Sequence, residues 1–487
     1  MNRIFSLCIV GCLSFLSVKQ AAAEPAQNKF NVLFIAIDDL RPELGCYGIK
    51  DAQSPNLDRL AKQGCLFTRH YVQVATCGAS RYALLTGRSP AASGVTRSNA
   101  GLYAGASALK QTQTAGAQSL PELFRRSGYV TSCIGKISHT ADGRVYAYNG
   151  QGDGRDEVPH AWDHLPTPFG PWKRGWGIFF AYEGGKHRED GGGHKDLMEF
   201  TAENDSDLPD GMLADTAIEQ LKEFKKGDKP FFMGLGFFKP HLPFVATKQD
   251  WDAFEGVDID IAADAVKPES YWHGSGEFYK YSTPYKKTNP LSPDAHRMAR
   301  RAYLACVRYS DRQVGRVLKA LDDLDMADNT VVVVWGDHGW HLGEQQIWAK
   351  HTPLERANRS VLMVRAPGME AAGVKTDTLV ETIDLYPTLI ELCAPKFQQT
   401  EHALDGRSFA ALLQGKPYED AKSAISYWGD AISVRNNTHR LIVKHKNGKV
   451  TQTDLYDLSN DQDNTTNIAA ENPEIVQQMM KQVKLKK

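Results

Sequence analysis

One apolar segment close to the N-terminus constrains the fold more than any other feature. Residues 31–37 read NVLFIAI and are followed at once by Asp38 and Asp39. A strand that is apolar on both faces is typical of a parallel sheet covered by helices on each side. Similar strands are predicted over residues 129–134, 230–238 and 330–335. The chain is therefore predicted to form a doubly wound α/β domain.

Helical patterns fill the intervals between these strands. Apolar residues recur at helical spacing over residues 54–64, 215–224 and 309–324. The first of these helices has a start signal, with Ser54 as the cap and Pro55 in the first turn. Residues 142–193 are rich in Gly, Trp, His and Asp and lack periodicity, which predicts long surface loops.

The pattern changes after about residue 416. Short antiparallel strands are predicted over residues 424–434, 440–446 and 451–458, and a closing helix over residues 471–483. We therefore expect a large domain over residues 24–415 and a small C-terminal subdomain over residues 416–487.

The first 23 residues have the pattern of a cleaved export signal. Arg3 precedes a mostly apolar stretch over residues 4–18, and residues 21–23 offer a small-residue cleavage site. This stretch is short for a membrane span, while Cys12 leaves a lipoprotein as an alternative. We expect an exported protein, periplasmic or secreted, without stable membrane insertion.

The overall charge bears on the ligands. Lys and Arg number 57 and Asp and Glu 58, so the formal net charge is −1. There is no general positive field to collect polyanions, which disfavours a nucleic-acid-binding surface. An anionic substrate would need a few local cations.

Acidic and imidazole side chains follow two of the predicted strands. Asp38 and Asp39 follow the first strand, and Asp337 and His338 follow residues 331–335. Sites in open α/β sheets form outside the carboxyl ends of the strands. Either pair alone could be turn chemistry, because Asp is common where strands end. Together they favour a site for one divalent cation, with mainly oxygen ligands that suit Ca²⁺ or Mg²⁺ better than zinc.

A twelve-residue motif indicates the chemistry. Residues 77–88 read CGASRYALLTGR. This resembles the signature of the type I, formylglycine-dependent sulfatases, in which Cys is followed by a variable residue, Pro or Ala, then Ser-Arg and later Leu-Thr-Gly-Arg. The resemblance implies that Cys77 is oxidised to formylglycine, whose hydrate is the nucleophile. A helix that begins near Ser80 would favour an anion at its N-terminus, where Arg81 could hold the formylglycine oxygens.

Further blocks extend the resemblance over most of the chain, and they are most similar to the iduronate-2-sulfatase group of that family. These blocks are GKISH at 135–139, KPHLPF at 239–244, WAK at 348–350 and LYDL at 455–458. The implied architecture is the alkaline-phosphatase-like sulfatase fold, with a mostly parallel central sheet flanked by helices and a small C-terminal antiparallel sheet. One departure is Ala79, where that group usually carries Pro. It leaves open whether a formylglycine-generating enzyme or an anaerobic sulfatase-maturing enzyme modifies Cys77.

The resemblance also implies residue roles. One Ca²⁺ would be held by Asp38, Asp39, Asp337, His338 and modified Cys77. The sulfate would be bound by Lys136 and Lys350. His139 would be the base that expels sulfate from the modified residue, and His241, with Lys350, would be the acid that protonates the leaving alcohol.

The implied substrate is a sulfated oligo- or polysaccharide, with 2-O-sulfated iduronate as the specific resemblance and a sulfated galactan such as carrageenan as the alternative. A uronate carboxylate could pair with Arg155, Lys186 or Arg188. A neutral galactose ring could stack on Trp172, Trp176 or Tyr182.

Two other classes remain open. One is a phosphatase or phosphonate hydrolase of the same superfamily. The other is a catalytically dead, carbohydrate-binding pseudo-sulfatase in which Cys77 stays a thiol.

Overall fold

The computed structural model describes residues 30–145, 153–262, 270, 272, 275–281, 290–459 and 465–483. The predicted export signal over residues 1–23 lies outside these ranges. Within them, no helix combines the length and apolar character needed to cross a bilayer. The six cysteines of the described ranges are all free thiols.

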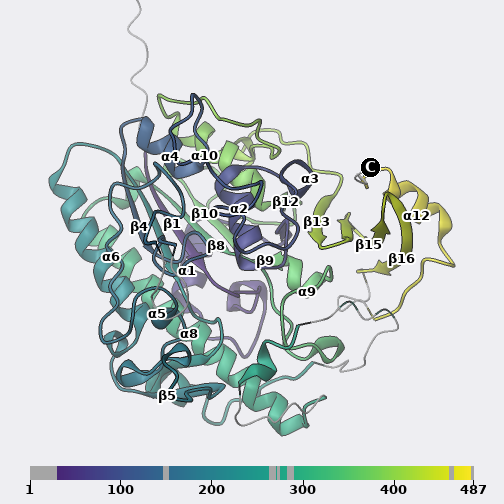
Figure 1. Cartoon of the computed structure of the whole chain (residues 1–487), viewed down its shortest axis with the longest axis horizontal. Coiled ribbons are helices and arrows are strands. Elements are labelled where there is room, and N and C mark those ends of the chain that lie inside the picture. The colour runs from purple at the N-terminus through teal and green to yellow at the C-terminus, as the bar shows by residue number, and fades with distance from the viewer. Residues whose placement is uncertain are drawn as a thin grey trace, which may run out of the picture.

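A seven-stranded sheet forms the centre of the molecule (Figure 1). Its order is β11-β2-β10-β8-β1-β6-β4, and β1 runs parallel to both β6 and β8. Strand β10 is antiparallel to its two neighbours, so the sheet is mixed but mostly parallel. The strands are β1 (Asn31–Ile37), β2 (Cys65–Phe67), β4 (Val130–Gly135), β6 (Phe231–Phe237), β8 (Thr330–Gly336), β10 (Leu362–Arg365) and β11 (Lys375–Thr376).

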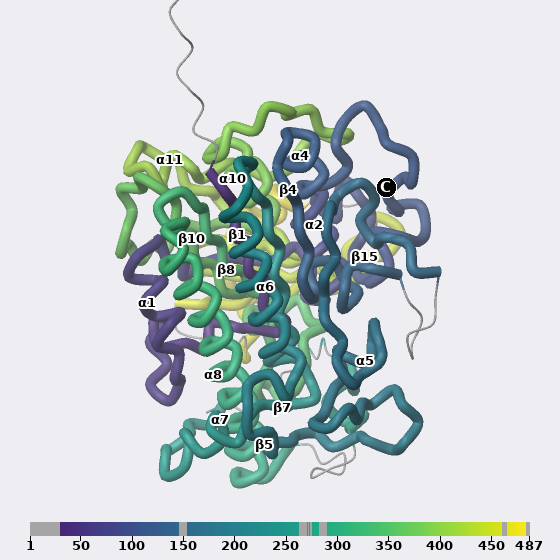
Figure 2. The backbone as a smooth tube through the Cα atoms, turned by 90° about the vertical axis from the view of Figure 1, so that its left-hand side faces the viewer, coloured from purple at the N-terminus to yellow at the C-terminus, as the bar shows by residue number. Residues whose placement is uncertain are grey.

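Helices cover both faces of this sheet, as the all-apolar strand β1 requires. Leu33, Ile35 and Ile37 pack in one core with α1 (Pro55–Gln63), α6 (Pro209–Lys226) and α8 (Pro293–Asp323). The alternate residues Val32 and Phe34 pack in a second core with α2 (Cys77–Thr86), α4 (Leu120–Arg126) and α10 (Leu385–Cys393). Figure 2 shows α6 and α8 lying across the sheet. The predicted doubly wound α/β architecture is confirmed.

Shorter elements connect these layers. The small strands are β3 (His70–Tyr71), β5 (Met198–Ala202), β7 (Phe244–Thr247), β9 (Arg359–Ser360) and β12 (Val380–Glu381). The short helices are α3 (Pro90–Ser93), α5 (Trp176–Phe179), α7 (Lys248–Asp252), α9 (Glu355–Asn358) and α11 (Ala410–Leu413). The 3₁₀ turns are Gly45–Tyr47, Glu183–Gly185, Arg188–Asp190, Asp205–Asp207, Phe278–Lys280, Ala327–Asn329, Glu344–Gln346 and Thr382–Asp384.

The C-terminal region forms a four-stranded antiparallel sheet at one side of the molecule (Figure 1). Its elements are β13 (Ala424–Trp428), β14 (Ala431–Arg435), β15 (His439–Lys446), β16 (Lys449–Asp457) and the helix α12 (Pro473–Met480). The prediction of one strand over residues 424–434 is wrong. Gly429, with a φ of 58°, turns the chain back so that two paired strands form.

The prediction of surface loops over residues 142–193 is also wrong for the second half of that segment. Trp172, Phe179 and Tyr182 are at most 3% exposed and belong to the core beneath α6 and α8. Trp172 Nε1 donates hydrogen bonds to the carbonyl oxygens of Tyr182 and Lys186. These aromatic side chains enter the core from a segment with little regular secondary structure. Their spacing in the sequence therefore follows neither the helical nor the strand period.

Candidate active site

The carboxyl ends of four parallel strands, β1, β4, β6 and β8, meet at one edge of the central sheet. The helix α2 begins beside this edge with Cys77, three residues earlier than the sequence predicts. The predicted site residues that follow these strands are Asp38, Asp39, Lys136, His139, His241, Asp337 and His338.

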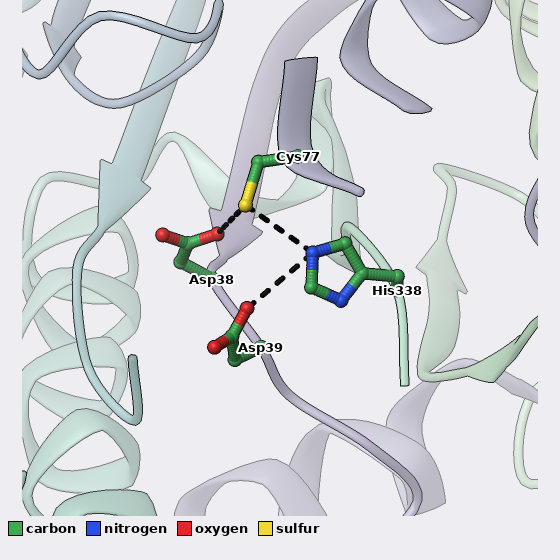
Figure 3. A group of neighbouring side chains, drawn as sticks. All are labelled: Asp38, Asp39, Cys77 and His338. Atoms are coloured by element: carbon green, nitrogen blue, oxygen red, sulfur yellow. Dashed lines mark hydrogen bonds and ion pairs between the residues drawn. The ribbon is translucent and has the colours of Figure 1, made fainter. Parts of the chain in front are cut away.

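Four buried side chains come together here (Figure 3). The possible ligand atoms of Asp38, Asp39, Cys77 and His338 all lie within 4.8 Å of one another. Cys77 Sγ is 3.2 Å from both Asp38 Oδ1 and His338 Nε2, and His338 Nε2 is 3.3 Å from Asp39 Oδ1. The arrangement surrounds a point that a single cation could occupy.

Asp337 lies beside this group and is held in place by two hydrogen bonds. Its Oδ1 accepts from the backbone N–H of Asp39 at 3.0 Å, and its Oδ2 accepts from Arg81 Nε at 3.0 Å. Its Oδ1 is also 3.6 Å from His338 Nε2. Burial and the charge of Asp38 raise the pKa of Asp337 above its ordinary value.

The donor set fits a hard divalent cation. Carboxylate oxygens such as those of Asp38, Asp39 and Asp337 are the ligands that Ca²⁺ and Mg²⁺ prefer, whereas His338 supplies one nitrogen. Burial raises the pKa of Asp39 even though the Lys350 cation opposes it. A cation near these carboxylates would favour their ionised form.

Three cationic side chains surround the carboxylates. Lys136 Nζ is 2.6 Å from Asp38 Oδ2, and Lys350 Nζ is 2.9 Å from Asp39 Oδ1. Arg81 is completely buried and contacts Asp38 as well as Asp337. Burial works to lower the pKa of Lys350, but Asp39, Glu277 and Asp38 act together against it and hold that pKa well above its ordinary value. The site therefore keeps fixed positive charge in a desolvated place, as binding a sulfate anion requires.

Two facing glycines allow Lys136 to reach the site. Gly135, at the end of β4, has a φ of 71°. A Cβ atom on Gly236 of β6 would lie 2.0 Å from the carbonyl oxygen of Lys136. The two strand ends approach closely only because neither residue has a side chain, and the chain can turn there to direct Lys136 toward Asp38.

The unmodified Cys77 side chain is a neutral thiol. Burial and the charge of Asp38 raise its pKa well above the ordinary value. The neighbouring His338 is neutral, because burial lowers its pKa to about 4. A thiol in this setting is a poor nucleophile, because the thiolate is the reactive form.

His139 lies at the side of the cluster. Its ring is 5.1 Å from that of Trp176, and its Nδ1 is buried without a hydrogen-bond partner among the described residues. Burial and the Lys136 charge lower the pKa of His139 well below its ordinary value. The ring is therefore neutral.

His241 contacts a carboxylate that the sequence did not indicate. Its Nε2 lies 3.3 Å from Oε1 of Glu277 and 3.9 Å from Oδ2 of Asp39. Glu277 Oε2 is 3.5 Å from Lys350 Nζ. Glu277 lies outside every recognised block and has no periodic neighbours, so only its position in space could have revealed it.

The residues predicted to contact a sugar ring have different environments. Trp172 and Tyr182 are buried with their polar atoms hydrogen-bonded, so the prediction that they could stack on a sugar is wrong. Trp176 is 8% exposed and packs against His139. Of the basic residues, Arg155 pairs with Asp153 and Lys186 with Glu199. Arg188 lies over the ring of Phe180, which is itself 6.0 Å from the ring of His241.

Comparison with known families assigns the chain to a family. The model described as sulfatase matches residues 30–394, a range that includes every predicted site residue. The chain belongs to the sulfatase family. As a sulfatase, it hydrolyses sulfate esters. A second family model, described as N-sulphoglucosamine sulphohydrolase, C-terminal, matches residues 343–487.

Individual relatives agree with this assignment. The sulfatase is 32% identical over 429 residues to iduronate 2-sulfatase from Mus musculus, a match that covers 80% of this chain and 73% of that protein. The iduronate 2-sulfatase of Homo sapiens is 30% identical over 414 residues, covering 77% and 70%. A solved phosphonate monoester hydrolase from Silicibacter pomeroyi superposes with a TM-score of 0.72 at 20% identity, covering 93% of this chain and 95% of that one. This last likeness shows the shared alkaline-phosphatase-like fold.

Proposed function

We propose that this sulfatase removes sulfate from a sulfated carbohydrate, with formylglycine made from Cys77 as the nucleophile. The observation that carries the proposal is the position of Cys77. Its sulfur lies at the start of α2 and within 3.2 Å of both Asp38 and His338. An anion that develops at this atom would lie at a helix N-terminus and close to Arg81, Lys136 and Lys350.

We assign one Ca²⁺ to the same place. Asp38, Asp39, Asp337, His338 and modified Cys77 would hold it, and its chemical contribution would be to polarise the sulfate oxygens and neutralise their charge. The support is the set of buried carboxylates: burial and the charge of Asp38 raise the pKa values of Asp39 and Asp337, and a cation between them would offset this repulsion.

The remaining roles belong to side chains of the chain itself. Lys136 and Lys350 are placed to bind the sulfate oxygens, and Arg81 to orient the modified residue. His139, with a neutral ring, is placed to accept a proton when sulfate is released. His241 and Lys350 are placed to donate a proton to the leaving alcohol, which is a poor leaving group without one.

For the substrate we propose a 2-O-sulfated uronic acid, as in iduronate. Two relatives are named iduronate 2-sulfatases. Arg188 supports the choice, because one aromatic ring, that of Phe180, separates this cation from His241. Arg188 pairs with Glu189 at 2.7 Å in the structure, and a substrate carboxylate could share its guanidinium. A galactan would need accessible aromatic rings for stacking, and Trp172 and Tyr182 are buried in the core.

We also propose that the chain is exported and matured. The support is the pattern of an export signal over residues 1–23, which favours the periplasm or the outside of the cell. A formylglycine-generating enzyme or an anaerobic sulfatase-maturing enzyme would be its partner during maturation.

Sulfate release from defined saccharides tests the substrate proposal. We expect the enzyme to release sulfate from a heparin-derived disaccharide that carries only a 2-O-sulfate. The Cys77→Ala variant should fold but release none. Activity on carrageenan oligosaccharides with none on the disaccharide would contradict the uronate assignment and leave the sulfatase chemistry in place.

A further inference from the structure

Glu277 lies between the two side chains that we propose protonate the leaving group. Its Oε1 is 3.3 Å from His241 Nε2, and its Oε2 is 3.5 Å from Lys350 Nζ. The side chain is 16% exposed, so the carboxylate is largely desolvated. A desolvated carboxylate is stable only with such partners, and each oxygen faces a different one.

Two carboxylates and two nitrogen groups alternate around a closed ring. Lys350 lies 2.9 Å from Asp39 on one side and 3.5 Å from Glu277 on the other. His241 likewise lies between Asp39, at 3.9 Å, and Glu277, at 3.3 Å. Asp39 is assigned to the metal. Glu277 is therefore the carboxylate that can pair with both donors without competing for the cation.

Aromatic packing fixes Glu277 in this position. The next residue, Phe278, is 2% exposed, and its ring stacks on that of Trp348 at 4.9 Å with an interplanar angle of 28°. Trp348 belongs to the same short block as Lys350. The segment that carries Glu277 is thus attached directly to the segment that carries one of the two donors.

The ring of His241 is anchored on its other side. Its Nδ1 lies 2.6 Å from the carbonyl oxygen of Leu242, an acceptor, so Nδ1 carries the hydrogen. The other nitrogen, Nε2, then faces the carboxylates of Glu277 and Asp39, so it can donate a proton when the ring is an imidazolium with a hydrogen on both nitrogens. Without Glu277, His241 Nε2 and Lys350 Nζ would each lose one of the two carboxylates that they face, and Asp39 would be the one that remains.

We propose that Glu277 is a positioning residue for protonation of the leaving group, acting through His241 and Lys350. The inference rests on the proposed function. When the S–O bond to the alcohol breaks, its electron pair passes to the alcohol oxygen, which takes a proton from His241 Nε2 or Lys350 Nζ. Glu277 forms and breaks no covalent bond. It holds the two N–H donors together on the side of the leaving oxygen.

Leaving-group dependence tests this role. An ester with an acidic leaving group, 4-nitrophenyl sulfate, needs little protonation, whereas phenyl sulfate needs more. We expect Glu277→Gln to lower kcat/KM for phenyl sulfate about 100-fold and for 4-nitrophenyl sulfate less than about 5-fold. Glu277→Asp should recover part of the loss on phenyl sulfate, since it keeps the charge. In the His241→Ala background, Glu277→Gln should lower kcat/KM for phenyl sulfate by a smaller factor than in the wild type, because only the contact with Lys350 is left to lose.

Asp163→Asn is the matched control. Asp163 pairs with Arg125 and with Thr131 at the start of β4, the end of the sheet opposite the site. The Asp163→Asn variant should have the same ratio of kcat/KM values for the two esters as the wild type. Melting temperatures identify any variant that fails to fold, and if Glu277→Gln fails, the same two-ester comparison on Glu277→Asp decides. Equal losses on both esters, or no loss on either, would overturn the role of Glu277. Wild-type enzyme that releases sulfate from neither the two esters nor the 2-O-sulfated disaccharide would instead contradict the proposed function and remove the basis of the inference.

Discussion

Arg81 connects the nucleophile motif to the metal-binding carboxylates. It is fully buried and contacts both Asp38 and Asp337, while its Nη1 donates to the carbonyl oxygens of Lys136 and Ile137. A guanidinium is suited to this position because it offers several fixed donors and stays charged. One side chain thus joins the ends of β1, β4 and β8 at the helix that carries Cys77.

Metal removal is the first test at this scale. Chelation of the purified enzyme should lower activity at least about 100-fold and lower its melting temperature, because Asp38 and Asp39 would be left close together without the cation. Added Ca²⁺ should restore both. Asp337→Ala should be inactive and not be restored by Ca²⁺. Full activity after complete chelation, or two stoichiometric zinc ions in metal analysis, would contradict the assignment.

Sequence patterns predicted most of the site residues, but not which of them contact one another. Asp38, Asp39, Cys77 and His338 are adjacent to buried strands or lie inside a motif, and the structure brings them within 4.8 Å. Glu277 belongs to no motif. It contacts His241 and Lys350, which are both distant from it in the sequence. A contact between distant residues leaves no local pattern that a reading of the sequence could detect.

At the scale of elements, a buried ion-pair cluster joins α9 to the C-terminal sheet. Glu355 Oε2 lies 2.5 Å from Arg440 Nη2 of β15 and 3.5 Å from Arg435 Nε of β14. Tyr71 of β3 donates a hydrogen bond to Glu355 Oε1 at 2.9 Å. The cluster links the small sheet to α9, which closely follows Lys350 in the sequence.

Breaking this cluster should be costly. Glu355→Ala leaves two buried arginines without their carboxylate and should lower the free energy of unfolding by about 3–5 kcal/mol. Urea unfolding followed by fluorescence measures the change. The control is Lys319→Gln, which removes an exposed pair with Asp323 and should leave the midpoint unchanged. Equal midpoints for the two variants would show that the cluster contributes nothing to stability.

Element prediction succeeded where packing follows a regular period. The strand β1 and the short helix α1 end within a residue of the predicted limits. The helix α8 begins at Pro293, well before the predicted residue 309. The prediction missed the first half of this helix because Arg297, Arg300 and Arg301 lie among its apolar residues. The predicted boundary near residue 416 stays a prediction.

At the scale of the whole molecule, a buried histidine makes stability depend on pH. His70 is fully buried between the carbonyl oxygen of Ser360 and the hydroxyl of Thr382, at 3.3 and 2.9 Å. Burial lowers its pKa from 6.5 to about 3. Below pH 6.5 the unfolded chain binds a proton that the folded chain excludes, so the contribution of His70 to stability is complete above that pH and is lost as the pH falls toward 3.

The His70→Gln variant isolates this effect. Glutamine keeps a donor and an acceptor but does not titrate, so between pH 6 and pH 4 its melting temperature should fall less steeply than that of the wild type. The difference corresponds to at most about 1.4 kcal/mol for each pH unit. Parallel melting curves across this range would show that His70 is already protonated in the folded enzyme.

The state of Cys77 in the active enzyme tests the central claim most directly. Mass spectrometry of the peptide that contains Cys77 should show a form about 18 Da lighter than the cysteine peptide, because formylglycine replaces the thiol with an aldehyde. Across preparations, the fraction of this lighter form should be proportional to the specific activity in sulfate release. A fully active preparation in which Cys77 remains an unmodified thiol would contradict the account.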